Sequence, residues 1–111
     1  MQNNKEYVLK EYGEEHKITL HKTSYAIDGS LAIKMICYDD GFPEPWDVLT
    51  TYIDGPVRPR FDCAYVQTDK YLDFIVENGI GELTDIIAQS GFNTYRLVRF
   101  NLNMITDNEE E

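Results

Sequence analysis

The chain has 111 residues, which suits one domain with a single hydrophobic core and is too short for two. Hydrophobic residues make up 42% of the chain and aromatic residues 13%, a composition that excludes a disordered protein. Twenty acidic residues against ten basic ones give a formal net charge of -10. This charge disfavours direct binding to nucleic acid or to an anionic membrane, and it favours a protein partner with a basic surface.

The first segments predict two β-hairpins. Residues 7–12 and 17–26 are rich in β-branched and aromatic residues, and a short connection that begins at Gly13 separates them. Asp28 and Gly29 then predict a second tight turn, because both residue types tolerate the positive φ that such turns require.

A central strand is expected directly after the second turn. Alternate side chains between residues 31 and 38 are expected to point to the same side, as in any β-strand. The set predicted to face the core is Leu31, Ile33, Met35 and Cys37. Further strands are expected at residues 46–53 and 63–66, and two prolines interrupt the chain between them.

One main helix is predicted at about residues 69–78. Thr68 or Asp69 would cap its start, and Gly79 stands where a left-handed residue commonly ends a helix. The helix face predicted to pack on the sheet, opposite the central strand, is Leu72, Ile75 and Val76.

The remaining segments complete a predicted α+β fold. Residues 82–90 fit either a short helix or a loop, whereas residues 94–102 again favour a strand. About five or six strands joined mostly by hairpins predict a single antiparallel sheet with the helix packed on it. We expect one domain over residues 1–106, followed by an acidic, frayed tail at residues 107–111.

The cysteines and the chain start bear on the compartment. Cys37 and Cys63 lie in apolar, strand-like segments, which favours buried free thiols over a disulfide. The sequence contains no apolar run long enough to cross a bilayer, and its first residues lack the apolar core of a signal peptide. We therefore expect a cytoplasmic protein without a membrane partner.

Three segments of the C-terminal half stand out together: "VQTD" at residues 66–69, "ENGIG" at residues 77–81 and "SGFNTYRLVRF" at residues 90–100. With the strand "GSLAIKM" at residues 29–35, they resemble a family of small bacterial domains of unknown function that are carried on phages and mobile elements. The resemblance implies a compact α+β domain and no known catalytic residues. It also suggests inhibitors of host nucleic-acid-handling machinery, which small acidic proteins from such genomes often are.

The segment "YDDGFPEPWD" at residues 38–47 gathers four carboxylates and two prolines around Trp46. It lacks the spacing of a calcium loop, and its prolines hold it extended, so a turn between strands is the simpler interpretation. His16 and His21 do not have the spacing of zinc ligands, and the glycines at 79–81 follow the predicted helix rather than open it. The sequence therefore predicts no catalytic residue, no metal site and no cofactor.

The uneven distribution of charge is the feature that points to a function. Neither residues 36–56 nor residues 72–94 contain a lysine or arginine, although acidic residues recur in both. One acidic face built from them would imitate the phosphates of nucleic acid, and an acidic solubilising surface explains the pattern equally well. The residues predicted to bind a partner are Asp39, Asp40, Glu44, Trp46, Asp47, Asp73 and Glu77.

The sequence thus predicts a non-enzymatic protein-binding module, encoded by a mobile element as an acidic inhibitor of a nucleic-acid-binding host defence enzyme. Two alternatives stay open: a small structural or oligomerising module that forms homo-oligomers, and an enzyme whose site assembles only in the folded chain. A flat acidic face would favour the inhibitor, whereas a deep pocket lined by groups with shifted pKa values would favour the enzyme.

Overall fold

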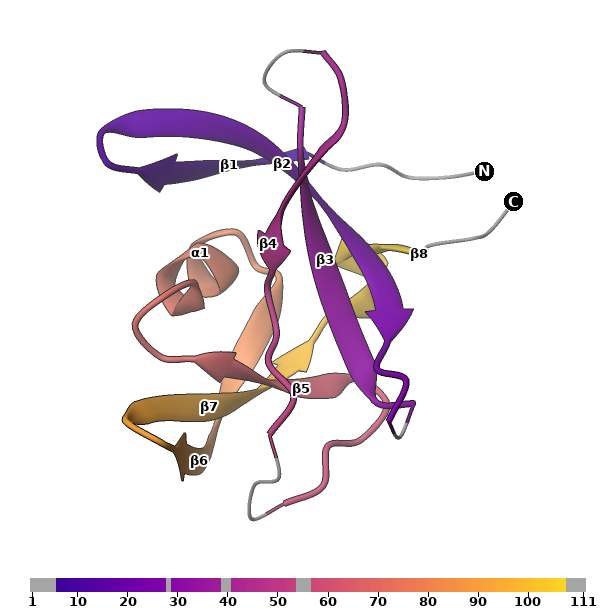
Figure 1. The fold of residues 1–111 in the computed structure, drawn as a ribbon, viewed down its shortest axis with the longest axis vertical. Helices are drawn as coiled ribbons and strands as arrows, with labels where there is room; N and C mark the ends of the chain where they lie inside the picture. The colour runs from indigo at the N-terminus through magenta and orange to yellow at the C-terminus, as the bar shows by residue number, and fades with distance from the viewer. Residues whose placement is uncertain (1–5, 28, 39–40, 54–56, 108–111) are drawn as a thin grey trace.

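The computed structural model describes residues 6–27, 29–38, 41–53 and 57–107, which form two β-sheets (Figure 1). In the first sheet, neighbouring strands are antiparallel in the order β1-β2-β3-β4. These strands are β1 (Glu6–Glu11), β2 (Glu14–Ser24), β3 (Leu31–Cys37) and β4 (Glu44–Val48). A two-residue strand, β8 (Thr106–Asp107), pairs in parallel with β2 beyond the end of β1.

The second sheet has three antiparallel strands in the order β5-β7-β6. They are β5 (Cys63–Gln67), β7 (Asn93–Phe100) and β6 (Gly81–Ser90). The helix α1 (Leu72–Glu77) connects β5 to β6, and the short 3-10 helix η1 (Leu102–Met104) leads from β7 to β8. In Figure 1, α1 lies beside β4 and below the β1–β2 hairpin.

The α+β prediction of a single sheet covered by one main helix is wrong, because the chain is mostly strand and has two sheets. Residues 82–90, for which the sequence allowed a helix or a loop, belong to β6. The helix α1 spans six residues instead of the expected 69–78. So short a helix cannot cover a sheet, and the second sheet does this instead.

The start of α1 explains why the predicted helix was too long. Neither Thr68 nor Asp69 caps it, since the first helical residue follows Tyr71, which makes no side-chain capping bond. The backbone N–H of Thr68 donates instead to the carbonyl of Thr94, 2.9 Å away, so this residue still belongs to the end of the second sheet. The Asp69 carboxylate accepts a hydrogen bond from the Gln67 amide at 3.0 Å.

The two sheets pack face to face across the main hydrophobic core. The four residues predicted to face inward from the central strand are all buried in this core, as expected. The predicted helix face is displaced by one residue: Tyr71, Phe74 and Ile75 are buried, whereas Val76 is about half exposed at 52%. The second sheet contributes Ala64, Val66, Val98 and Phe100.

A second, smaller cluster covers the opposite face of the second sheet. Its buried members are Cys63, Tyr65, Ala88, Tyr95 and Leu97. The two clusters lie on opposite faces of the second sheet, so β5 and β7 contribute buried apolar side chains on both faces. Cys63 lies in this cluster and Cys37 in the main core, so the two buried thiols are not joined to each other.

The end of α1 is as the sequence predicts. Gly79 has a φ of 67°, and its N–H donates to the carbonyl of Val76 at 3.2 Å. The N–H of Ile80 donates to the carbonyl of Ile75 at 2.9 Å, and both side chains are fully buried. These two bonds form the Schellman motif, in which the left-handed residue favours glycine.

Both N-terminal hairpins are confirmed. Tyr12 and Gly13, with φ values of 53° and 80°, form the turn between β1 and β2. Gly29, with a φ of 75°, lies in the turn between β2 and β3, whereas its predicted companion Asp28 lies outside the described residues.

At the C-terminus, the backbone of Asp107 pairs with Lys22, and residues 108–111 of the predicted tail lie outside the described residues. Among the residues that the structure describes, no helix is both long and apolar enough to span a membrane.

The helix offers a direct test of the main core. Truncation of the fully buried Ile75 in Ile75→Ala should lower the free energy of unfolding by about 2 to 5 kcal/mol, through lost burial and the cavity left behind. The adjacent Val76→Ala is the matched control and should cost less than about 1 kcal/mol, because this side chain is half exposed. Equal losses for both variants in denaturant melts would show that α1 does not pack as described.

Candidate functional site

The residues predicted to bind a partner divide into two groups. Glu44, Asp73 and Glu77 are exposed, as a surface site requires. Trp46 and Asp47 are partly buried and take part in contacts between elements. Asp39 and Asp40 lie outside the described residues.

A β-bulge in β4 explains how two consecutive residues are both partly buried and both contact other elements. Met35 pairs with Asp47 and the next residue, Ile36, pairs with Pro45, so Trp46 is an extra residue in β4. Such a bulge interrupts the alternation of side chains across a strand. Trp46 accordingly packs against the main core while Asp47 reaches the start of α1. The predicted turn at residues 38–47 thus ends in a strand from Glu44 onward.

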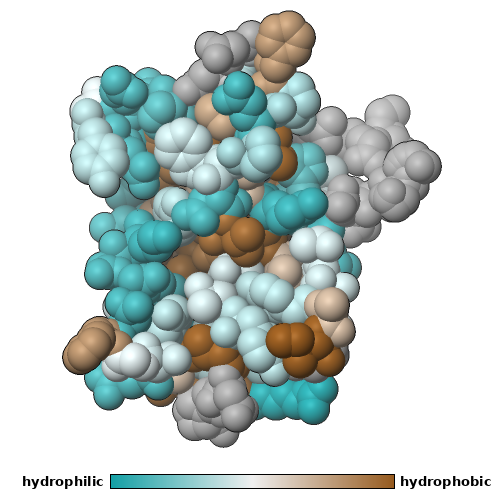
Figure 2. Space-filling view, viewed as in Figure 1, coloured by the Kyte–Doolittle hydropathy of each residue, from teal (hydrophilic) through white to brown (hydrophobic). Residues whose placement is uncertain are grey.

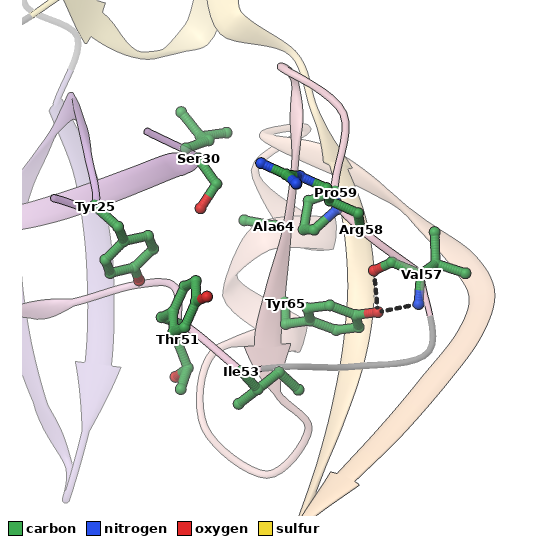
Figure 3. A pocket seen from close by; sticks show the side chains of 11 residues that line it. Tyr25, Ser30, Thr51, Ile53, Val57, Arg58, Pro59, Ala64 and Tyr65 are labelled. Carbon is green, nitrogen blue, oxygen red and sulfur yellow. Dashed lines mark hydrogen bonds between the residues drawn. The ribbon is translucent and has the colours of Figure 1, made fainter. Parts of the chain in front are cut away.

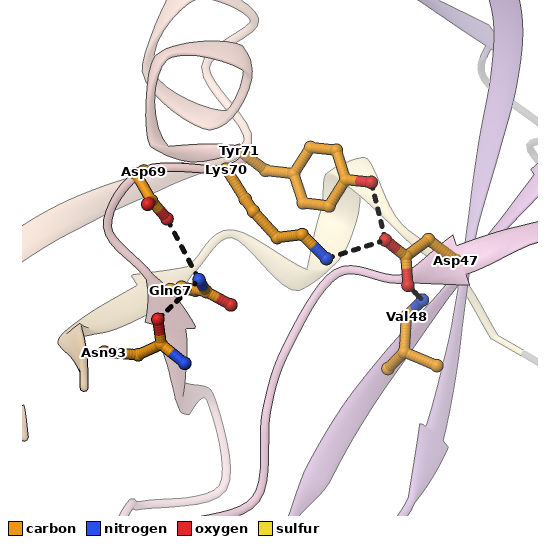
Figure 4. Close-up of polar contacts among 7 residues, drawn as sticks. All are labelled: Asp47, Val48, Gln67, Asp69, Lys70, Tyr71 and Asn93. Atoms are coloured by element: carbon orange, nitrogen blue, oxygen red, sulfur yellow. Dashed lines mark hydrogen bonds and ion pairs between the residues drawn. The ribbon is translucent and has the colours of Figure 1, made fainter. Parts of the chain in front are cut away.

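The Asp47 carboxylate joins β4 to the start of α1 (Figure 4). Its Oδ2 accepts a hydrogen bond from the Tyr71 hydroxyl at 2.7 Å and lies 3.4 Å from the Lys70 Nζ. Its Oδ1 accepts a hydrogen bond from the backbone N–H of Val48 at 2.7 Å. The aspartate is therefore already engaged by groups of its own chain, and it fixes the helix against the edge of the first sheet.

The protonation states of Asp47 and Tyr71 are those of a structural contact. Burial alone would raise the pKa of Asp47, but the hydrogen bonds from Tyr71 and Val48 and the charge of Lys70 outweigh burial, and the pKa is lowered. Burial, together with the hydrogen bond to Asp47 and its charge, raises the pKa of Tyr71 far above its ordinary value. At neutral pH the aspartate is charged and the tyrosine is neutral, so neither group is poised for proton transfer.

Two aromatic rings extend this contact toward the β1–β2 hairpin. The rings of Trp46 and His16 are in contact, with centroids 4.6 Å apart and planes tilted by 39°, and the His16 Nε2 lies 3.7 Å from a Glu14 carboxylate oxygen. We call Asp47, Tyr71, Lys70, Trp46 and His16 the seam, because they join α1, β4 and β2. No local sequence pattern predicts the seam, since Asp47 and Tyr71 are 24 positions apart.

A cavity of about 160 Å³ lies between β5 and the segments that follow β2 and β4 (Figure 3). The hydroxyl of Tyr65 donates to the Val57 carbonyl at 2.7 Å and accepts from its N–H at 3.2 Å. The hydroxyl of Tyr25 forms a hydrogen bond with the hydroxyl of Thr50 at 2.8 Å, and burial raises the pKa of Tyr25. The lining residues include no histidine, cysteine or carboxylate among those described, and the cavity is smaller than a typical ligand pocket.

In the described part of the chain, no group of three or more histidine, cysteine, aspartate or glutamate side chains is arranged to hold a metal ion.

Four exposed acids lie on α1 and on the strand that follows it. Asp73 and Glu77 lie one helical turn apart, and Glu82 and Asp85 are exposed on β6, which contacts α1. We call these four residues the α1–β6 acids. Arg99 is the cross-strand neighbour of Glu82, but its side chain lies 3.6 Å from the Asp62 carboxylate. The residues predicted to bind a partner included the two helical acids but not the two on β6, although the acid-rich stretch of residues 72–94 contains all four.

Exposed hydrophobic side chains are scattered over the surface. Tyr12, Phe42 and Phe92 lie beside turn glycines and are largely exposed. Figure 2 shows one mostly hydrophilic face on which the hydrophobic patches are small and separated.

Removal of one hydroxyl should test the seam. In Tyr71→Phe the buried ring stays but the bond to Asp47 is lost, which should cost about 1 kcal/mol at neutral pH, because the aspartate is partly open to solvent. The pKa of Asp47 is lowered on folding, so this stabilisation is present above its ordinary value of 3.8 and disappears as the pH falls through the lowered value.

Denaturant melts of wild type and Tyr71→Phe should therefore differ at pH 7 and converge in strong acid. Tyr12→Phe is the control, since that side chain is 99% exposed and should leave stability unchanged at every pH. A difference for Tyr71→Phe that is independent of pH would contradict the charged state assigned to Asp47.

The comparisons with known proteins add one relationship to this geometry. No curated protein and no solved structure matches the chain. A family model does match residues 19–111, from the middle of β2 to the last residue of the sequence, and its description is "Domain of unknown function (DUF4313)". This match covers well over half of the sequence, so the chain belongs to this family of domains of unknown function.

Proposed function

We propose that this chain is a non-enzymatic module that binds a basic protein partner through the α1–β6 acids, and that a mobile element encodes it as an inhibitor of a nucleic-acid-binding host defence enzyme. The observation that carries the proposal is the exposure of Asp73, Glu77, Glu82 and Asp85 on two elements in contact with each other. Carboxylates held by packed elements can match the phosphate-binding positions of a basic groove, and they steer association at long range.

The rigid support of these acids favours a specific surface over a merely solubilising one. The buried side chains of Phe74 and Ile75 anchor α1 to the main core, and the Schellman motif at Gly79 sets the direction in which β6 leaves the helix. Glu44 on β4 adds an exposed carboxylate to the predicted set. Asp47 and Trp46, by contrast, support α1 from the seam, so we assign them no direct contact with the partner.

Two features support a non-enzymatic module: the protonation states of the seam and the hydrogen bonds at the cavity between β5 and the segments after β2 and β4. The carboxylate and phenol of the seam have pKa values displaced away from neutrality, in opposite directions. The tyrosine hydroxyls at the cavity already bond to groups of the chain itself. The mobile-element origin rests on the resemblance of residues 29–35 and 64–102, and the choice of a defence enzyme as target rests on that origin and on the acidic charge.

The test begins with capture of partners from a bacterial host on the immobilised chain. The variant Asp73→Asn/Glu77→Gln/Glu82→Gln/Asp85→Asn is compared with a variant that neutralises the C-terminal acids Asp107, Glu109, Glu110 and Glu111. Both variants change the net charge equally, by four units, since each replaces four carboxylates. The captured protein should bind nucleic acid, and the wild-type chain should compete with nucleic acid for it.

Association kinetics across a salt series then decide the mechanism. The α1–β6 variant should associate at least about tenfold more slowly at low salt, with a smaller change in dissociation rate, because steering acts before contact. The C-terminal variant should stay near wild type. Binding that is independent of salt, or that is lost only in the C-terminal variant, would contradict the acidic-surface proposal.

A further inference from the structure

The strand β1 forms an edge of the first sheet. Among the described residues it pairs only with β2, and β8 pairs with β2 further along the same side. The six residues of β1 include no proline, and no register shift interrupts their pairing with β2. Val8 is 48% exposed near the middle of the strand. Exposed edges of this kind are templates for pairing with another chain.

The turn determines which backbone groups of β1 point outward. A two-residue turn makes Glu11 and Glu14 a hydrogen-bonded pair, and such pairs alternate along an antiparallel ladder. Val8 and Lys17 are then a non-hydrogen-bonded pair, and the Lys17 carbonyl indeed accepts from Tyr38 of the β3 side instead. The N–H and C=O groups that point away from β2 are consequently those of Glu6, Val8 and Lys10.

The side chains of these three residues make the edge self-complementary. Glu6, Val8 and Lys10 are exposed and share the outer face of the first sheet, opposite the buried Tyr7 and Leu9. In a two-fold antiparallel pairing centred on Val8, each Val8 faces its equivalent, and Glu6 faces Lys10 of the second copy. In the same register, the outward N–H and C=O groups of the two β1 strands face each other. One arrangement therefore forms the backbone hydrogen bonds and also pairs the opposite charges.

We propose that β1 is a self-association site, at which two copies of this chain join their first sheets by antiparallel β1–β1 pairing. The interface is small, so the dimer is weak and depends on concentration. The net charge of -10 on each chain opposes it. At physiological salt, however, the screening length is about 8 Å, which weakens this long-range repulsion far more than the contact between Glu6 and Lys10.

This surface is separate from the α1–β6 acids, and β1 lies outside residues 19–111 that match the family model. Self-association is therefore assigned to this chain and not to its family, and its failure would leave the proposed function standing.

Two charge reversals test the register. In Glu6→Lys, the introduced lysine faces Lys10 of the second copy, and in Lys10→Glu the introduced carboxylate faces Glu6, so each variant repels itself. Sedimentation velocity over a concentration series at physiological salt should show wild-type dimers and a dissociation constant raised at least about tenfold in either variant. A mixture of the two variants should form a heterodimer, because both cross-strand pairs then carry opposite charges.

Recovery of dimerisation on mixing distinguishes charge repulsion from misfolding, because two misfolded variants would not form a heterodimer when combined. Lys34→Glu is the matched control, because Lys34 is exposed on β3, away from the β1 edge, and its variant should dimerise as wild type does. Circular dichroism establishes that all variants are folded. A wild-type chain that stays monomeric at every concentration, or a mixture that stays as dissociated as its components, would overturn the proposal.

Discussion

The burial of the inner faces of two small sheets against each other is the constraint on which the rest of the structure depends. The first sheet presents the alternate residues of β3 on one face, and a helix of six residues is too short to cover them. The second sheet supplies the cover with Ala64, Val66, Val98 and Phe100. Because the hydrophobic effect is the dominant favourable term in folding, these contacts determine how the two sheets are placed relative to each other.

The polar features follow from this arrangement. With α1 set against the edge of the sheets, its start meets β4, where the bulge at Trp46 turns both Trp46 and Asp47 inward. The hydrogen bond between Asp47 and Tyr71 is then a consequence of this packing. Partial burial of the two groups also strengthens the hydrogen bond. The face of α1 that remains outside carries Asp73 and Glu77, and the strand after it carries Glu82 and Asp85. Packing thus decides which acids are available to a partner and which serve the fold.

The sequence predicted those features that local chemistry determines. The turns at Gly13 and Gly29 and the helix end at Gly79 each need a left-handed residue, and the alternation in β3 reflects burial of one face. The strand β6 was missed because its register shifts between Leu83 and Ile87, which breaks the alternation that would reveal it. The seam, and with it the inward role of Asp47, depends on contacts between distant segments that no local pattern encodes.

The two sheets share one core, so we expect them to unfold together and to keep the acids and the β1 edge in fixed positions. Native-state amide hydrogen exchange tests this most directly, because it measures the opening free energy of each strand. The slowest amides of β3 and of β7 should exchange with the same free energy, equal to that of global unfolding. Exchange from β7 at a much lower free energy, with β3 still protected, would show that the second sheet opens independently and would contradict the account.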